Sequence, residues 1–201
     1  MSRSGRAREE NTAGLSNVKF VKGNVLEPET FRDHMKDIDG VIHCVGTLIE
    51  SRNDPKLSYN AMNRDSAINV AKVLNENAEQ KGEHKKFVLI SSEKAPPFLD
   101  AYMTSKIEAE KYLQEKCPNL DTFSIRPGFI VDQQHRWWSI PLSFGVNVSW
   151  WLNSRVIQPY LPLGSKIDFL FPAKSVQLST VAHFAIEGVM GNLGTDGQKI
   201  I

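Results

Sequence analysis

The chain has 201 residues, of which 41% are hydrophobic and 23% are charged, enough for one sizeable core or at most two small ones. Its 24 basic and 23 acidic side chains leave a formal charge of +1, which argues against nucleic acid as a partner because phosphate backbones are bound by clustered positive charge. The two cysteines are too few for a disulfide framework, and no cysteine–histidine cluster has zinc spacing. We therefore expect a single domain, with neither a structural metal nor a nucleic-acid partner.

The order of predicted elements indicates the fold class. Residues 1–17 are polar and lack aliphatic periodicity, so we expect a flexible N-terminus. From residue 18 onward, short β-branched runs alternate with longer helical patterns, which is typical of βαβ units and a parallel sheet. The predicted strands are 18–21, 40–46, 86–91 and 122–126, and the predicted helices are 28–36, 59–79, about 101–114 and about 180–190. We expect an α/β core over residues 18–132 and a smaller cap over residues 133–201.

The sharpest chemical feature is YMTSK, which places Tyr102 and Lys106 four residues apart at the start of a helix and on one helix face. A free phenol has a pKa of about 10. An ammonium roughly 5 Å away, at an effective dielectric of about 20, would favour the phenolate by about 3 kcal/mol. Such a tyrosine can act as a general acid or base beside a carbonyl group. The alternative is an ordinary aromatic residue and a solvated lysine, because the spacing also arises by chance.

The position of this pair relative to the predicted strands strengthens the catalytic interpretation. Ser92 follows the KFVLIS strand ten residues before Tyr102, and RPG follows the next strand. Open α/β sheets form their ligand crevice at the carboxyl ends of parallel strands. Five further segments occur in a characteristic order around the pair, namely VKFVKGN, GVIHCVGTL, YNAMNRDSAINVAKV, FVLISS and SIRPGFIVD. With these motifs the chain resembles the short-chain dehydrogenase/reductase superfamily, in its extended or atypical branch.

The resemblance implies a Rossmann-like parallel sheet with flanking helices and assigns roles to particular residues. Tyr102 and Lys106 would be the catalytic pair, with Lys106 also holding the nicotinamide ribose hydroxyls. Ser92, or alternatively Ser91, would bind the substrate carbonyl, although turn chemistry at a strand end explains both serines equally well. The resemblance also implies cofactor binding by residues at the strand ends and on the helix after the second predicted strand, namely Asn24, Val45, Gly46, Asn63, Pro127, Gly128 and Ile130. For the residues at the strand ends, close packing is the alternative interpretation. Asn24 stands where relatives usually carry an aspartate that meets the adenine.

The start of the chain bears on the choice of cofactor. The tetrapeptide SRSG resembles the end of the family's second strand, where Arg3 would bind the 2′-phosphate of NADP and so favour NADP over NAD. The alternative is a solvated basic end. The sequence contains no GxxGxxG or GxGxxG loop, which brings the backbone close to the pyrophosphate in this family. We therefore expect a truncated chain that lacks the first βαβ unit, has a gap in its sheet between residues 18–21 and 40–46, and binds a dinucleotide weakly.

All four tryptophans lie close together, as Trp137-Trp138 and Trp150-Trp151. They are compatible with the lining of a site for an apolar or ring-shaped substrate. A docking surface for a partner or a membrane interface is a second interpretation, and a core helix packed on the sheet is a third. The uncharged run 137–152 is too short to span a bilayer and is interrupted by proline and glycine.

Within the superfamily, YMTSK, IEAEKYL and RPGFIVDQQHRWW are most similar to fungal mitochondrial dehydrogenase-like proteins linked to coenzyme Q (ubiquinone) biosynthesis, and also to the dehydrogenase-like accessory subunit of respiratory complex I. This resemblance implies a mitochondrial location, although no targeting peptide is recognisable in residues 1–17. It also implies quinone-pathway or respiratory-complex partners and peripheral association with the inner membrane. Two functions are compatible with it, an NAD(P)-dependent oxidoreductase in which Tyr102 transfers the proton, and a non-catalytic accessory or assembly protein of a quinone-handling complex.

Overall fold

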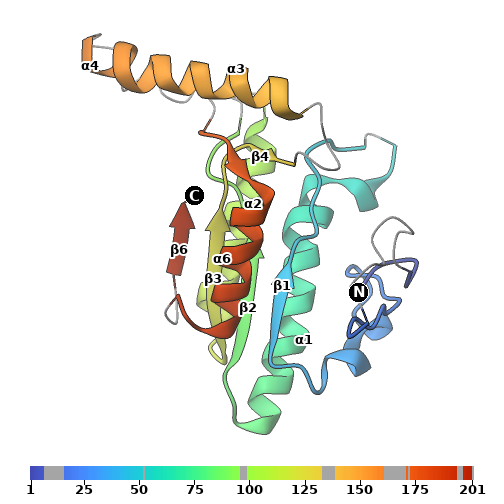
Figure 1. Ribbon diagram of the computed structural model, residues 1–201. Helices are drawn as coiled ribbons and strands as arrows, with labels where there is room; N and C mark the ends of the chain where they lie inside the picture. The colour runs from blue at the N-terminus through green and yellow to red at the C-terminus, as the bar shows by residue number, and fades with distance from the viewer. Residues whose placement is uncertain are drawn as a thin grey trace.

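The main sheet is parallel. The computed structural model describes residues 1–6, 16–51, 53–95, 99–132, 139–160, 171, 173–193 and 197–200. Within these ranges four strands pair in the order β1-β2-β3-β6, and their bounds are Gly40–His43, Lys85–Ile90, Leu120–Arg126 and Gly197–Ile200. Helices lie on both faces of this sheet (Figure 1). The predicted α/β, Rossmann-like fold is therefore confirmed.

Two apolar clusters, one on each face of the sheet, form the core. Helices α1 (Ser66–Lys81) and α2 (Asp100–Lys116) share the larger cluster with Phe87 and Leu89 of β2. Helix α6 (Leu178–Met190) shares the smaller one with Val88. Because successive strand side chains point to opposite faces, a strand covered on both sides is apolar on both, as the run FVLI within KFVLIS is.

The remaining elements are short, except for one helix. The predicted helix 28–36 forms two 3-10 turns, Pro28–Thr30 and Arg32–Met35, and a third such turn spans Pro55–Leu57. A π-helical segment, Asn60–Asp65, leads into α1. Strands β4 (Ile130–Val131) and β5 (Val176–Gln177) pair in parallel as a separate two-stranded sheet. Helix α3 (Ser139–Leu152) continues through a π-helical segment (Asn153–Ile157) into the short helix α4 (Gln158–Tyr160).

The prediction of a strand at residues 18–21 is wrong. Val18 and Phe20 are 49% and 42% exposed, and the segment's β contact is an isolated parallel bridge between Ser2 and Lys22. The physical reason is that, among the described residues, no strand lies between this segment and β1, which is the edge of the sheet. The segment therefore has no ladder of backbone hydrogen bonds to join.

The N-terminus is more ordered than we expected where it is described. The backbone N–H of Ser2 donates to the carbonyl of Val21 at 2.9 Å, and the N–H of Gly23 donates to the carbonyl of Ser2 at 3.0 Å. These two bonds hold the first residues against the segment that precedes the 3-10 turns. The other residues that we predicted to be flexible, 7–15, lie outside the described residues.

Two cavities lie between this N-terminal segment and the region of β1. Their volumes are about 300 and 360 Å³. Met1, Val25 and Val45 line both of them, so the two cavities are neighbours. Because Val45 follows β1, both cavities lie directly beside the loop after this strand.

The region expected to form a cap divides into two parts. Figure 1 shows α3 beyond the end of the sheet to which the strand arrows point, with its axis across the strands. In contrast, β6 pairs with β3, and Val181 and Ala185 of α6 are buried in the smaller core cluster, so the last part of this region belongs to the main sandwich. Residues 133–138, which include Trp137 and Trp138, lie outside the described residues. Among the described helices, none combines the length and apolar character that crossing a membrane requires.

Candidate functional site

The predicted catalytic pair lies at the carboxyl end of β2. Lys106, on the second turn of α2, donates from Nζ to the carbonyl of Ile90, the last residue of β2, at 3.0 Å. A side-chain hydrogen bond joins the Tyr102 hydroxyl to Ser92. Tyr102, Lys106 and Ser92 are therefore brought together as the sequence predicts. Ser91 is buried, and its hydroxyl has no hydrogen-bond partner among the described residues, so the geometry favours Ser92 as the partner of the phenol.

The pKa of Tyr102 moves in the direction opposite to our prediction. Burial raises it, the proximity of Tyr59 adds to the rise, and the hydrogen bond with Ser92 acts against it. Lys106 does not lower it, because its ammonium group is directed to the carbonyl of Ile90. Burial also lowers the pKa of Lys106 itself, to about 8. At neutral pH the phenol is protonated, which suits a proton donor better than a proton acceptor.

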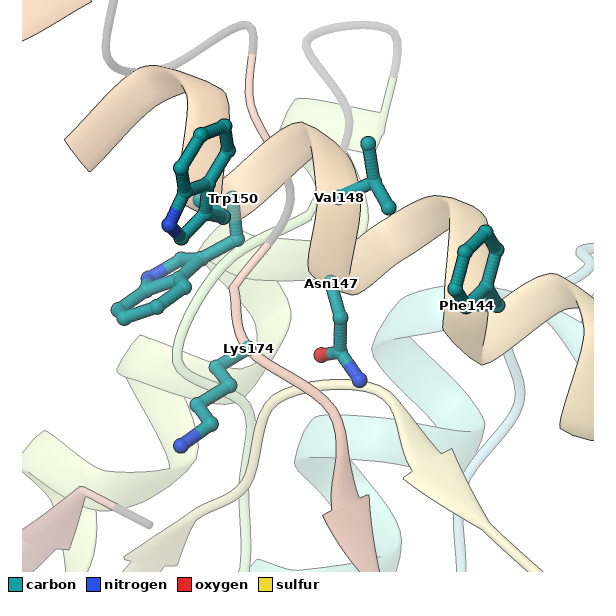
Figure 2. A pocket seen from close by; sticks show the side chains of 6 residues that line it. Phe144, Asn147, Val148, Trp150 and Lys174 are labelled. Carbon is teal, nitrogen blue, oxygen red and sulfur yellow. The ribbon is translucent and has the colours of Figure 1, made fainter. Parts of the chain in front are cut away.

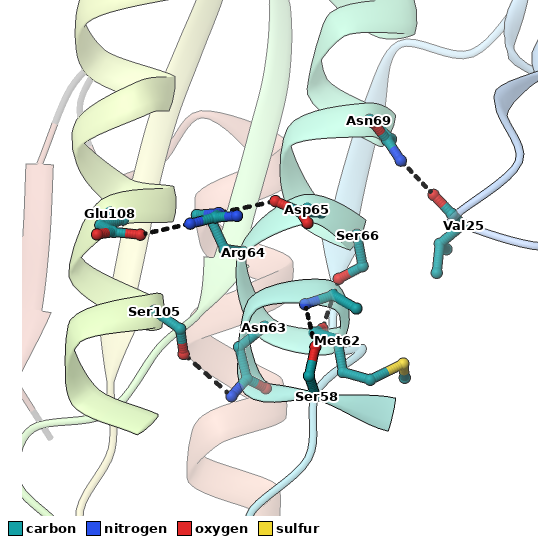
Figure 3. Close-up of polar contacts among 11 residues, drawn as sticks. Val25, Ser58, Met62, Asn63, Arg64, Asp65, Ser66, Asn69, Ser105 and Glu108 are labelled. Carbon is teal, nitrogen blue, oxygen red and sulfur yellow. Dashed lines mark hydrogen bonds and ion pairs between the residues drawn. The ribbon is translucent and has the colours of Figure 1, made fainter. Parts of the chain in front are cut away.

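A buried asparagine connects the loop after β1 to helix α2. Asn63 is fully buried in the π-helical segment, and its Oδ1 accepts the backbone N–H of Thr47 at 2.7 Å. Its Nδ2 donates to the carbonyl of Thr47 at 3.1 Å and to Ser105 Oγ at 3.3 Å. Figure 3 shows this link to Ser105 beside a second link from Arg64 to Glu108. π-Helical segments often occur at functional sites, and this one presents Asn63 one residue ahead of an ion-paired arginine.

Gly46 lies against this cluster without room for a side chain. A Cβ atom at this position would stand 2.9 Å from Asn63 Oδ1 and 3.1 Å from Lys106 Nζ. Asn63 cannot yield easily, because its amide is held at both ends by hydrogen bonds. Gly46 therefore allows the backbone of the β1 loop to approach the lysine that the resemblance assigns to ribose binding.

Replacing Gly46 by alanine is expected to displace Lys106 or Asn63, at a cost of about 1–3 kcal/mol in the free energy of unfolding, as is typical of overpacking. Urea unfolding followed by circular dichroism measures this change. The reference variant is Gly145→Ala, where an added Cβ meets no atom within 4 Å and the helix interior favours alanine, so its stability should equal or exceed that of the wild type. Equal unfolding free energies for the two variants would contradict the close packing described for Gly46.

A second group of predicted residues lines the cavity of about 300 Å³. Arg3, Asn24 and Val45 all contribute to its wall. The side-chain oxygen of Asn24 accepts the backbone N–H of Leu26 at 3.2 Å, so this residue also stabilises the turn that forms the wall. Val45 directly precedes Gly46, which places the cavity next to the Lys106 cluster. Arg3, Asn24 and Val45 are therefore brought together at one cavity, beside the loop that carries Gly46.

The residues after β3 have a different set of neighbours. The carbonyl of Pro127 accepts the backbone N–H of Glu93 at 3.1 Å, which keeps this residue beside the end of β2. At Gly128 a Cβ would stand 2.0 Å from the carbonyl oxygen of Lys174, so this glycine is required by the approach of another backbone segment. Ile130 lies in β4 and pairs with Val176. Gly128 and Ile130 therefore make their contacts with the segment that carries β5.

Two buried polar groups near the site were missed by sequence reasoning. Burial lowers the pKa of His43, on β1, to about 3, and its Nε2 lies 3.2 Å from Ser66 Oγ. Glu110 is buried and forms an ion pair of 2.5 Å with Arg126 at the end of β3. Glu110 could have been found because it follows Lys106 by one helical turn and so shares its face. His43 carried no such signal, since a lone histidine in an apolar strand has no patterned partner.

A parallel sheet between two helical layers, with polar side chains gathered at its strand ends, defines a Rossmann-like dinucleotide-binding fold. A family model described as NAD(P)H-binding matches residues 2–140. The chain therefore belongs to this NAD(P)H-binding family.

Solved structures of short-chain dehydrogenases have the same fold, as the resemblance predicted. One, from Mycobacterium paratuberculosis and bound to NAD, has a TM-score of 0.57 and 14% sequence identity, covering 92% of this chain and 73% of that one. Another, from Mycobacterium marinum, has a TM-score of 0.56 and 14% identity, covering 91% and 73%.

A curated relative is the MIOREX complex component 2 of Saccharomyces cerevisiae, which is 25% identical over 178 residues. The match covers 68% of this chain and 64% of the relative, so the chain spans less than two thirds of that protein's length.

Proposed function

We propose that this protein is an NAD(P)-dependent oxidoreductase that acts on a carbonyl or hydroxyl group. The observation that carries the proposal is the cluster at the end of β2, where Tyr102 is hydrogen-bonded to Ser92 and Lys106 lies one helical turn further on. The nicotinamide group supplies or accepts the hydride. Ser92 orients the substrate oxygen, and the protonated phenol of Tyr102 donates its proton to that oxygen during reduction.

Lys106 is suited to hold the ribose hydroxyls of the cofactor. Lys106 is buried, with only 5% of the residue exposed, and its ammonium group is held in place by its hydrogen bond to the carbonyl of Ile90. With a pKa of about 8 it is largely charged at neutral pH, which preserves its capacity as a donor. Gly46 lets the cofactor-facing backbone approach this group.

The finer parts of the proposal concern cofactor choice and setting. Arg3 lines the cavity beside Asn24, which supports NADP as the preferred cofactor. The resemblance to coenzyme Q biosynthesis proteins supports a mitochondrial, quinone-related role with peripheral association at the inner membrane. The yeast relative's name, as the component of a complex, supports partners drawn from a quinone-pathway or respiratory assembly.

Isothermal titration of the chain with NADPH and with NADH tests cofactor binding. We expect NADPH to bind more tightly than NADH. Arg3→Gln should lower the affinity for NADPH by roughly tenfold or more and leave the affinity for NADH unchanged, because a charged hydrogen bond to phosphate contributes about 1.5–3 kcal/mol. Arg6→Gln, in the same exposed segment, is the matched control. Binding of neither nucleotide would refute the proposed function, whereas equal affinities would refute only the NADP preference.

A second function is favoured by specific observations, namely that of a non-catalytic accessory protein in a quinone-handling complex. The relative from yeast is named as a complex component. A Rossmann-like fold can also serve such a complex as a scaffold, because a fold does not by itself imply catalysis. Under this alternative the chain binds the cofactor but shows no turnover.

A further inference from the structure

Helix α3 exposes an unusually apolar surface. None of its 14 residues is charged. Phe144 is 73% exposed and Trp151 is 52% exposed. Other large apolar side chains of the helix are also exposed, namely Ile140, Leu142, Val148, Trp150 and Leu152. Soluble proteins rarely leave such a contiguous patch uncovered, so this surface requires an occupant.

The packing beneath α3 leaves part of its aromatic surface open. A cavity of about 340 Å³ lies between α3 and the segment that carries Lys174, with Phe144, Val148, Trp150 and Trp151 in its wall (Figure 2). Asn147 anchors the helix there, since its Oδ1 accepts the backbone N–H of Ser175 at 3.0 Å. Ser139, at the start of the helix, is also hydrogen-bonded to the backbone of Asp132, so α3 is held at two places while its aromatic side chains stay accessible.

Cations gather at the C-terminal end of α3, whereas Asp132, whose backbone is hydrogen-bonded to Ser139, lies at its N-terminal end. Residues 133–167 contain no aspartate or glutamate, yet they contain Arg136, Arg155 and Lys166, in a chain that is close to neutral as a whole. Arg155 follows α3 by three residues and is exposed. Lys174 Nζ lies 5.5 Å from the centre of the Trp150 ring, so a second cation stands at the same end of the helix. This part of the surface is complementary to negative charge.

Tryptophan, lysine and arginine side chains are favoured at the interface of a bilayer, because each combines an apolar body with a polar tip. Cations close to an anionic membrane each contribute about 1 kcal/mol of attraction. A helix of this length extends about 21 Å, which is less than the hydrocarbon thickness of about 30 Å, so it suits a position in the plane of the interface. A bilayer therefore matches both the apolar surface and its charge.

We infer that α3 docks the protein on an anionic lipid bilayer, with Phe144 and Trp151 inserted among the acyl chains and Arg155 and Lys174 at the headgroups. This inference rests on the membrane setting in the proposed function and assigns that setting to one helix. Figure 1 shows α3 beyond the end of the sheet to which the strands point. Tyr102 lies at this end, because it contacts Ser92, which follows β2. Docking through α3 brings the candidate site close to the bilayer surface.

Vesicle flotation with the full chain tests the inference. The vesicles are phosphatidylcholine alone, or equal parts of phosphatidylcholine and phosphatidylglycerol. We expect binding to the anionic vesicles, with a loss of binding as salt is added. Because all four tryptophans lie between residues 137 and 151, intrinsic fluorescence reports on this region alone. Brominated lipids should quench it, and its emission should shift to the blue.

Two double variants separate the contributions to docking. Phe144→Ser with Trp151→Ser is expected to weaken binding to anionic vesicles by more than tenfold, since large apolar side chains leave the bilayer. Arg155→Gln with Lys174→Gln is expected to weaken it by about tenfold. The apolar control is Ile186→Ser with Met190→Ser, two exposed side chains on α6, and the charge control is Lys111→Gln with Lys116→Gln on α2. Far-ultraviolet circular dichroism verifies that each variant is folded.

Three outcomes would overturn the inference. The first is that the wild-type chain fails to bind anionic vesicles, and the second is that the α3 variants bind them as well as the control variants do. The third is a dimer in light scattering that becomes monomeric on Phe144→Ser with Trp151→Ser, because a second copy would then be the occupant of this surface. NADPH titration of the same preparation tells this failure apart from a failure of the proposed function, since cofactor binding does not depend on vesicles.

Discussion

Replacing Tyr102 by phenylalanine is expected to lower kcat for reduction of a carbonyl substrate by about 10²–10⁴-fold, because the variant loses the proton donor and little else. The ring contact with Tyr59, whose centroid lies 6.0 Å away, does not involve the hydroxyl. NAD(P)H affinity should therefore remain unchanged. Oxidation of NADPH, followed by its absorbance with quinones and other carbonyl compounds as acceptors, provides the rate, and titration calorimetry provides the affinity.

The matched control for this variant is Tyr112→Phe on the same helix. Tyr112 lies under Lys72 Nζ, 5.5 Å from its ring centre, and the resemblance gives it no place in the site. Turnover that survives Tyr102→Phe would refute a proton-donor role for Tyr102. The accessory function is the better description under two conditions. The wild-type chain binds NADPH but does not oxidise it with any of the acceptors tested, and Tyr102→Phe leaves the cellular phenotype and the protein level unchanged.

Replacing Lys106 by methionine is expected to change the pH dependence of stability. In the folded protein the pKa of Lys106 is about 8, below its ordinary value of 10.5, because burial disfavours the charged form. The unfolded chain therefore binds more protons between these two values, and the free energy of unfolding rises with pH across that window. One residue contributes at most about 1.4 kcal/mol per pH unit, so the full gain is on the order of 3 kcal/mol. Lys106→Met should lack this gain.

Urea unfolding of the wild type and of Lys106→Met at several pH values from 7.5 to 10.5 measures this difference, with the range chosen to bracket the window above. Lys111→Met, at an exposed position of α2, is the control and should follow the wild type. Lys106→Met should also weaken NADPH binding by roughly tenfold or more, since it removes a charged donor. Parallel stability curves for wild type and Lys106→Met would contradict the buried, pKa-shifted lysine that the proposed function uses.

Much of the fold was predictable because helices and strands follow from patterns among residues that are close together in the sequence. The run KFVLIS is apolar at every position that a doubly covered strand must bury, and β2 forms there. Helix α2 matches its predicted bounds within two residues, whereas the helix predicted from residue 59 begins as the π-helical segment and becomes α1 at Ser66. Tyr102 and Lys106 occupy one face of α2 because four-residue spacing is a local property of any helix. The element order alone then predicted a parallel sheet, and with it the strand ends where the site lies.

Other properties depended on residues far away in the chain. The run at 18–21 has the composition of a strand, but a strand also requires a hydrogen-bonded neighbour, and the described residues provide none between it and β1. Composition likewise left three interpretations for the tryptophans, and only the packing leaves Trp150 and Trp151 accessible on α3. The pKa of Tyr102 rises because burial outweighs the hydrogen bond with Ser92, while the ammonium of Lys106 is directed to the carbonyl of Ile90.

The sequence by itself determined which segments form helices and strands and which residues could meet at the strand ends. The tertiary structure decided which serine contacts the phenol, where Lys106 directs its charge, and which apolar residues stay exposed. Periodicity is a local property that every chain carries along its length, whereas burial and hydrogen-bond partners are set by atoms from separate segments that only folding brings together.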